Sequence, residues 1–372
     1  MADSAPKEFV DLVAISRGYQ RSQALRVAAE LGIADLLSGS PRSVGELAAT
    51  TRSHQAALYR LLRALSAIGV FHEDSGHRFA LTAMGEYLRT DHALSVDPVI
   101  RMFCADYEWR AWGDLLHSVQ TGENAAVHVL GMDIWEYRHE HPGHGRIFDA
   151  AMRTLSGITT PDILSAYDFG RYRVVADIGG GTGTMLASIL ASHPGVRGIL
   201  FDQAHVVAHA DPVLEAAGVA NRVEVVTGDF FQAVPRGADA YLLRRILHDW
   251  PDDRATQILR RVHQAMTPEA RLVIVDAVIG PPNHDPLAKF LDLMMLVSAG
   301  GHERTEPEWV RLLATAEFRF ERATPATSNS QVIEATPRRA GRPLRAVEPC
   351  TALSRSVPAA GRRCSRGSDS DR

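Results

Sequence analysis

The feature of this sequence that most constrains its fold is a series of five short apolar, β-branched runs that alternate with helical segments. This alternation is typical of a parallel sheet covered by helices, because parallel strands need long crossover connections. We therefore predict an α/β fold, with two later runs at 318–322 and 331–334 completing the sheet. The five predicted strands span residues 173–178, 198–202, 223–227, 240–244 and 271–277.

The N-terminal part has a different pattern. Residues 8–37 are predicted to be helical, with Gly32 as a stop signal. Ser43 is expected to cap a short helix, and a second helix with leucines on one face should end at Gly69. Two short strands around a polar turn follow, at 70–71 and 78–81. Together these elements predict a winged helix-turn-helix.

A winged helix alone would suggest DNA binding, but the composition of its second helix argues against that function. The helix at 55–68 carries Arg60 and Arg63 and otherwise consists mostly of alanine and leucine. A helix that reads DNA needs a basic, polar face for the groove. We therefore interpret this helix as a packing surface.

Charge and composition divide the rest of the chain. Residues 336–372 hold nine arginines against three acidic residues, a net charge of +6. The formal net charge of the whole chain is −4, so the rest of the chain carries −10. An acidic body argues against nucleic acid as a partner, and the Arg-, Pro- and Ser-rich tail is predicted to be disordered. The predicted domains are a winged-helix domain at 1–97, a helical, aromatic-rich segment at 98–166, a Rossmann-like domain at 167–335 and the tail at 336–372.

The sequence also predicts where the protein resides. We see no run of about 18 apolar residues that would cross a membrane, and the first residues have no apolar signal-peptide core. The three cysteines, Cys104, Cys350 and Cys364, form neither a disulfide framework nor a zinc spacing. We expect a cytoplasmic protein.

A glycine-rich turn, Gly179-Gly-Gly-Thr-Gly183, joins the first predicted strand to a helix. Glycines allow the backbone to approach a ligand closely. The dinucleotide pattern Gly-x-Gly-x-x-Gly fails, because its third glycine would fall on Thr184 or Leu186, and no phosphate-binding Gly-Lys-Ser/Thr follows. The turn therefore predicts a ligand close to the backbone but does not favour a pyrophosphate.

Acidic side chains follow the next two predicted strands. Asp202 can accept hydrogen bonds from both hydroxyls of a ribose. The segment Gly228-Asp229-Phe230 suits an adenine, because the acid accepts from an amino group and the ring stacks. Parallel strands end at one edge of a sheet, where open α/β sheets bind ligands. The three loops together predict a nucleoside site.

His248 follows the fourth predicted strand on the same edge and can accept a proton near neutral pH. A carboxylate on its other ring nitrogen would fix the tautomer and stabilise the imidazolium. The candidates are Asp276, which ends the fifth strand, and Glu303, in the loop 300–305. The set predicts general-base catalysis. The alternative is a capping or surface histidine before the helix at 253–266.

These motifs are similar to those of the class I methyltransferases of the caffeic-acid O-methyltransferase type, which include bacterial enzymes that tailor aromatic polyketides and other antibiotics. The resemblance extends from about residue 10 to residue 335. It is carried by Asp177-Ile-Gly-Gly-Gly-Thr-Gly183, Phe201-Asp202, Gly228-Asp-Phe-Phe231, His248-Asp-Trp250 and Gly300-Gly-His-Glu303-Arg-Thr305.

The resemblance implies metal-independent methyl transfer from S-adenosylmethionine to a hydroxyl of an aromatic small molecule, by a homodimer joined through its winged helix. Plant members of the family carry lysine at the position of Arg244, and some animal members carry arginine at the position of Arg245. Strand alternation should point only one of these two arginines into the site. The implied cofactor contacts are Gly179, Gly181, Asp202, Asp229, Phe230 and one of the two arginines.

For the acceptor, the resemblance implies a flat apolar pocket that involves Phe148, Met152 and Met294, with Trp109 or Trp112 nearby. The alternative for each is core packing. Two rival functions also stay open. One is a winged-helix transcriptional regulator that senses a small molecule, and the other is a methyltransferase fold adapted to hydroxylation.

Overall fold

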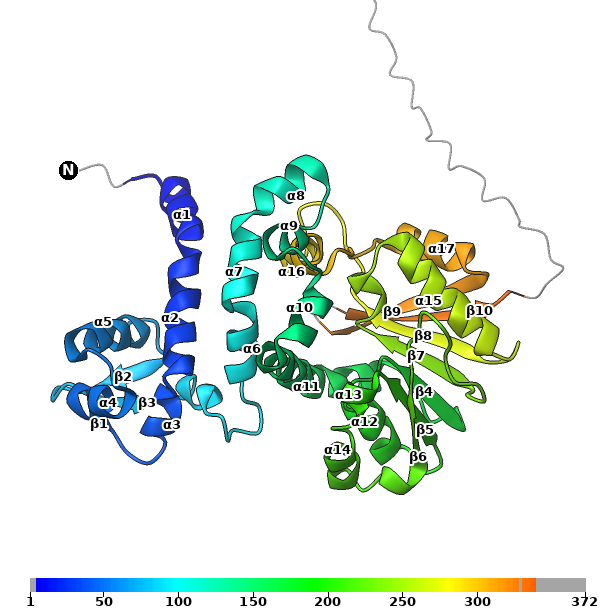
Figure 1. Ribbon diagram of the computed structural model, residues 1–372, viewed down its shortest axis with the longest axis horizontal. Helices are drawn as coiled ribbons and strands as arrows, with labels where there is room; N and C mark the ends of the chain where they lie inside the picture. Colours follow the sequence, from blue (N-terminus) through cyan, green and yellow to red (C-terminus); the bar gives the residue numbers. More distant parts are fainter. Residues whose placement is uncertain (1–4, 328–329, 339–372) are drawn as a thin grey trace, which may run out of the picture. The chain divides into compact units, whose positions relative to one another are not determined.

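The computed structural model describes residues 5–327 and 330–338 (Figure 1). The predicted N-terminal helical segment consists of three helices, α1 (Lys7–Ser16), α2 (Gly18–Glu30) and α3 (Ile33–Leu37). Arg17 leaves helical geometry between the first two, and Gly32 separates the last two with a left-handed φ of 61°. Gly32 is therefore the stop that the sequence predicted.

The predicted winged helix is present. The hydroxyl of Ser43 caps α4 in a capping box with Glu46. Leu58, Leu62 and Leu65 form the buried face of α5, while Arg60 and Arg63 lie on its exposed face. A three-stranded antiparallel sheet of order β1-β3-β2 completes the unit. Its elements are β1 (Arg42–Ser43), α4 (Val44–Thr51), α5 (Gln55–Ser66), β2 (Phe71–Glu73), β3 (Arg78–Leu81) and the 3₁₀ turn η1 (Gly85–Leu88).

The middle of the chain is helical, as predicted, and connects the winged helix to the sheet (Figure 1). Its last helix, α11, is 25 residues long and packs against both α6 and the sheet-covering helix α12. Across the described residues we find no helix with the length and apolarity of a membrane span. The helices are α6 (Asp97–Phe103), α7 (Asp106–Gly113), α8 (Leu115–Thr121), α9 (Ala125–Leu130), α10 (Ile134–Glu140) and α11 (Pro142–Ala166).

The C-terminal half contains the predicted α/β sheet of seven strands in the order β6-β5-β4-β7-β8-β10-β9. The first five are parallel, and β10 and β9 add an antiparallel edge. The order reverses between β4 and β7, and the carboxyl ends of strands at such a switch point are where open α/β sheets bind ligands. The strands are β4 (Val174–Ile178), β5 (Arg197–Asp202), β6 (Val223–Thr227), β7 (Ala240–Arg244), β8 (Arg271–Asp276), β9 (Phe318–Thr327) and β10 (Ser330–Pro337).

Helices cover both faces of this sheet, because its strands are apolar on both sides. One face packs on α11, α12 and α14, and the other on α15 and α17. The helices and turns of this half are α12 (Thr184–Ser192), α13 (Ala204–Val207), α14 (Asp211–Ala216), η2 (Ala220–Arg222), η3 (Leu247–Asp249), α15 (Asp252–Ala265), α16 (Pro286–Met294), the π-helical turn η4 (Met295–Ala299) and α17 (Glu306–Thr315).

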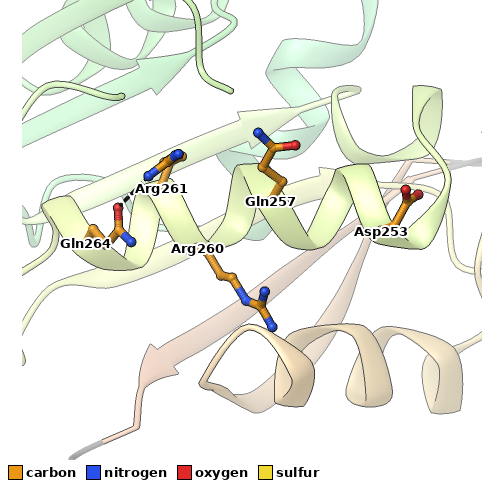
Figure 2. A pocket seen from close by; sticks show the side chains of 5 residues that line it. All are labelled: Asp253, Gln257, Arg260, Arg261 and Gln264. Carbon is orange, nitrogen blue, oxygen red and sulfur yellow. Dashed lines mark hydrogen bonds between the residues drawn. The ribbon is translucent and has the colours of Figure 1, made fainter. Parts of the chain in front are cut away.

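Polar side chains on the outer side of α15 line a surface hollow, which Figure 2 shows. Two of them, Gln257 and Arg261, donate hydrogen bonds to the backbone oxygen of Phe231, at 3.2 and 3.0 Å. Arg260 points to α17, where it donates to the Thr315 oxygen. This hollow contains none of the predicted site residues. Two of its side chains instead anchor the loop after β6, and a third contacts α17.

The strand β10 runs to Pro337, and the Arg338 amide donates to the Glu317 oxygen at 2.7 Å. The sheet therefore includes Thr336 and Pro337, which the sequence analysis placed in the tail. The remainder of the predicted disordered tail lies outside the described residues.

Candidate active site

The glycine-rich turn follows β4 and adopts the backbone that only glycine takes readily. Gly179, Gly181 and Gly183 have φ values of 69°, 62° and 81°. A Cβ on Gly179 would lie 2.5 Å from Cδ1 of Ile246, so this turn packs directly against the segment that leads into His248. A Cβ on Gly181 would meet nothing within 4 Å. Gly181 thus leaves open space beside the backbone at the carboxyl end of β4.

Asp202 links the first two predicted loops. Its Oδ2 accepts a hydrogen bond from the Gly181 amide at 2.8 Å, and its Oδ1 accepts from the Gln203 amide at 2.7 Å. Burial raises the pKa of this carboxyl, and the two amide hydrogen bonds oppose the shift. Each carboxylate oxygen keeps a further lone pair, which allows Asp202 to accept from ligand hydroxyls.

The third predicted loop lies beside the other two. The Gly228 amide donates to the Asp202 backbone oxygen at 3.0 Å, and a Cβ on Gly228 would lie 2.6 Å from the Phe201 ring. Asp229 is exposed and accepts from the Phe231 amide at 2.8 Å. A Cβ on Gly179 would lie 3.6 Å from the Phe230 ring. The structure therefore brings all three predicted cofactor loops together.

Buried polar atoms without partners surround the glycine turn. Within the described residues, Oδ2 of Asp177 and the hydroxyls of Thr182 and Thr184 are buried and make no hydrogen bond. Burial raises the pKa of Asp177 to about 7, although the positive charge of Arg244 acts in the opposite direction. Unsatisfied buried groups are costly, so their concentration here fits a bound ligand that supplies both donors and acceptors. Sequence reasoning had given none of the three a separate role.

Arg244 and Arg245 point to opposite sides of the sheet. Arg244 reaches α11, where its guanidinium donates to the hydroxyls of Ser156, Thr159 and Thr160, the last at 3.0 Å. Burial lowers the pKa of Arg244 to about 10, and Asp177 opposes that shift. Arg245 instead donates to the Ser330 hydroxyl at 3.1 Å. Of the two candidates, Arg244 is the one on the side of Asp177 and the glycine turn.

His248 lies in η3, directly after β7, and is 5 % exposed. Its Nδ1 is 2.7 Å from Glu303 Oε1 and 3.6 Å from Asp276 Oδ1. Its Nε2 is 3.5 Å from Oδ1 of the next residue, Asp249. Both predicted carboxylates therefore flank the imidazole, but only Glu303 is within hydrogen-bond distance. The histidine is buried, which contradicts the alternative of a surface residue.

The charges around His248 decide how it titrates. Burial by itself would lower the pKa of the imidazole, but the carboxylates of Asp276, Asp249 and Glu303 together raise it to about 9. Burial raises the pKa of Asp276 to about 6, and the charge of His248 opposes that shift. This cluster stabilises the imidazolium that forms when His248 accepts a proton.

Two residues that sequence reasoning had not assigned hold the Glu303 loop on η3. A Cβ on Gly301 would lie 2.1 Å from the His248 backbone oxygen, so the two backbones are in direct contact. Arg304 is fully buried and donates to the oxygens of Leu247 and Trp250, at 2.9 and 3.0 Å. The only sequence signal for both was their place in the motif 300–305. These contacts hold Glu303 in position beside His248, although its loop is distant from His248 in the sequence.

Aromatic rings continue from the cofactor loops toward α11. The Trp250 ring lies 6.3 Å from that of Phe230 and 6.3 Å from that of Trp135, with which it is stacked. Trp135 contacts Phe148 edge to face at 5.7 Å. The stack of Trp250 and Trp135 thus begins two residues after His248, and neither ring was assigned to the acceptor pocket from the sequence.

The other predicted acceptor residues divide into two methionines near the site and two tryptophans away from it. Met152 is half-buried on α11, one turn after Phe148. Met294 is half-buried at the end of α16, which is tied to the site because Asp292 accepts from the Glu303 amide at 2.8 Å. The structure does not place the two tryptophans of α7 with these rings. Trp109 packs on Tyr19 of α2, and Trp112 packs in a separate cluster around Val297.

Comparisons with known proteins agree with this geometry. A family model described as an O-methyltransferase domain matches residues 112–319, and one described as an O-methyltransferase dimerisation domain matches residues 13–91. The chain is 40% identical over 315 residues to the mitomycin biosynthesis 6-O-methyltransferase of Streptomyces lavendulae, covering 84% of this chain and 89% of that protein.

Solved structures give the same picture. The crystal structure of LaPhzM is 40% identical and superposes with a TM-score of 0.86, covering 90% of this chain and all (100%) of that one. The O-methyltransferase NcsB1 from neocarzinostatin biosynthesis, solved with S-adenosylmethionine and 2-hydroxy-5-methyl naphthoic acid, is 32% identical with a TM-score of 0.74, covering 85% of this chain and 96% of that one.

Proposed function

Because this chain belongs to the family of S-adenosylmethionine-dependent O-methyltransferases with a dimerisation domain, we propose that it methylates a hydroxyl of an aromatic small molecule with His248 as the general base. The observation that carries the proposal is the 2.7 Å contact between His248 Nδ1 and Glu303. A carboxylate can only accept, so Nδ1 carries a proton toward Glu303. In the neutral ring, Nε2 is then the basic atom.

The chemistry asks little more of the protein than a base and accurate placement. S-adenosylmethionine, when bound, supplies an electrophilic methyl group on sulfur. His248 Nε2 takes the proton of the acceptor hydroxyl as the new O–CH₃ bond forms and the S–CH₃ bond breaks. Glu303 and Asp276 stabilise the resulting imidazolium. Placing the acceptor oxygen in line with the methyl group contributes through proximity and orientation.

For the cofactor, we assign the residues of the three strand-end loops. Asp202 would hold the ribose hydroxyls, and Asp229 and Phe230 the adenine. Gly179, Gly181 and Gly228 let the backbone approach the ligand. The unpaired carboxylate oxygen of Asp177 suits the ammonium group of the amino-acid part. Arg244 would keep α11 against this end of the site through its three hydroxyl partners.

For the acceptor, we propose a slot between α11 and η3, lined by Phe148, Met152, Met294, Trp135 and Trp250. The rings of Phe148, Trp135 and Trp250 offer the flat apolar walls that an aromatic acceptor needs, and the two methionines add flexible apolar surface. That slot lies on the His248 side of the cofactor loops, since Trp250 directly follows the His-Asp pair.

The test is a methyl-transfer assay with S-adenosylmethionine and a panel of phenols, naphthols and hydroxyquinones, followed by mass spectrometry. We expect a product that gains one CH₂ unit, in the presence or absence of a chelator. The chelator arm matters because the ligand atoms of His248, Asp276 and Glu303 lie within 4.8 Å of one another, a spacing that a cation could also use. A product that gains oxygen instead would favour hydroxylation. Calorimetry that detects no S-adenosylmethionine binding would reject the proposal.

A further inference from the structure

We propose that Arg138 is an anion-binding residue of the acceptor site, so that the preferred acceptors are hydroxylated aromatics that also carry a carboxylate. This inference rests on the proposed function and narrows its substrate class. Neither the motifs nor the assigned machinery makes use of Arg138.

The side chain of Arg138 projects from α10 toward aromatic rings instead of into solvent. Its Cζ lies 3.9 Å from the centre of the Phe148 ring and 5.3 Å from that of Trp135. Its side chain is only 10% exposed. Arginine side chains are rarely buried, because removing a guanidinium from water is costly unless its N–H groups form hydrogen bonds.

The guanidinium of Arg138 is only partly satisfied. Its Nη2 donates to Glu108 Oε1 at 3.2 Å, a long distance for a charge-assisted hydrogen bond. Its Nε is buried and has no hydrogen-bond partner among the described residues. Glu108 divides its charge, because its other oxygen accepts from the Ser298 hydroxyl at 2.6 Å. A guanidinium in this state can still bind an anion through its remaining donors.

The position of Arg138 relative to the base follows from α11. Phe148, Met152 and Ser156 are four residues apart and therefore share one face of that helix, over about 12 Å. Ser156 contacts Arg244 at the cofactor end, and Phe148 contacts Arg138 at the other. Trp135 connects the Arg138 end to Trp250 and so to η3. The positive charge of Arg138 also reaches the neighbourhood of His248: burial raises the pKa of the adjacent Asp249, and the charges of His248 and Arg138 oppose that shift.

A ring held between these walls would have its hydroxyl at His248 and its far edge toward Arg138. A carboxylate at that edge would form a charge-assisted, two-pronged pair with the guanidinium. An uncharged group of the same shape would form no ion pair with the guanidinium and would therefore add little to the binding affinity.

The experiment uses 3-hydroxy-2-naphthoate and 6-hydroxy-2-naphthoate, each with its carboxamide as the uncharged match. Binding to the full chain saturated with S-adenosylhomocysteine is measured by calorimetry, and methyl transfer by mass spectrometry. We expect at least one acid to bind about 10- to 100-fold more tightly than its amide. Arg138→Gln should remove that difference and leave amide binding unchanged, while Arg138→Lys should keep part of it.

Glu108→Gln is the matched control. It retains hydrogen-bonding groups toward Arg138 and Ser298 but removes the competing charge, so the preference for the acid should persist or grow. If Arg138 only ties α10 to Glu108, both variants would weaken acid and amide alike, which overturns the inference. Should Arg138→Gln fail to fold, the comparison of Arg138→Lys with the native chain decides in the same way.

Failure of this inference differs from failure of the proposed function. Equal binding of acid and amide, with both methylated, would overturn the role of Arg138 and leave the methyltransferase proposal intact. A preference for the acid that depends on Arg138, without methyl transfer to either probe or to the wider phenol panel, would support Arg138 and count against the proposed reaction.

Discussion

Oε1 of Glu303 lies 2.7 Å from Nδ1 of His248, although 55 residues separate the two in the chain. This contact orients the imidazole and, in the proposed reaction, leaves Nε2 as the atom that accepts a proton. It also joins the loop after β7 to the loop before α17, so the imidazole and its carboxylate partner are held by different parts of the sheet edge. The reaction proposed above depends on this pairing.

Replacing His248 by Ala should lower kcat by about 10²- to 10⁴-fold, because the acceptor would lose its base. Affinity for S-adenosylmethionine, measured by calorimetry, should change little, since other loops hold the cofactor. The defect should shrink for a more acidic phenol, which ionises without help. Near-normal turnover of His248→Ala with a weakly acidic phenol, under conditions in which chemistry limits the rate, would show that placement alone suffices.

The activity should rise as the pH approaches about 9, because three carboxylates raise the pKa of His248 to about that value. Only the deprotonated imidazole is a base, so kcat/KM should increase about tenfold per pH unit below the pKa and level off above it. Glu303→Gln removes one negative charge and should move the midpoint of the rise to lower pH. A pH profile whose midpoint is the same in Glu303→Gln would contradict the electrostatic coupling.

Replacing Asp202 by Ala should weaken S-adenosylmethionine binding by about 1–3 kcal/mol, through lost hydrogen bonds to the ribose and through release of the Gly181 amide. The control is Glu269→Ala, which removes an acid from an exposed turn between α15 and β8. Calorimetry on both variants measures the effect. Equal affinity in the two variants would mean that Asp202 does not contact the cofactor.

Gly301→Ala should abolish most activity, because a methyl group there would lie 2.1 Å from the His248 backbone oxygen and push the Glu303 loop away from η3. The matched control is Gly157→Ala on the exposed side of α11, where an added Cβ meets nothing within 4 Å. That control should be neutral or slightly more stable, by up to about 1 kcal/mol. Comparing thermal unfolding with turnover separates a local displacement from global unfolding. Retention of full activity by Gly301→Ala would be inconsistent with the observed backbone contact.

The dimer should depend on α1, in which none of the ten residues is buried. Phe9, Leu12 and Ile15 are 62%, 68% and 75% exposed, an apolar surface suited to a second copy of the chain. We expect the native protein to be a homodimer by light scattering and Leu12→Glu to shift it toward monomer. Glu8→Gln on the same helix should leave the dimer intact. A stable dimer of Leu12→Glu would place the interface elsewhere.

The sequence by itself determined the local features of this protein. Alternating apolar runs marked the strands of the sheet, because a strand buried on both faces needs such residues whatever surrounds it. The glycine turn and the Ser43 cap could also be predicted from the sequence, since each depends on backbone geometry within a few residues. These features, with the motif resemblance, were sufficient to predict the α/β fold, the cofactor and three strand-end loops that lie together in the structure.

Only the tertiary structure decided which distant residues meet. Strand alternation placed Arg244 and Arg245 on opposite sides, but the side that faces the glycine turn depends on how α11 packs. Asp276 ends its strand as predicted, but its short side chain stops 3.6 Å from His248. Glu303 therefore makes the hydrogen bond to the imidazole instead. Gly301 and Arg138 gave little local signal, because their contacts form only when separate segments of the chain pack together.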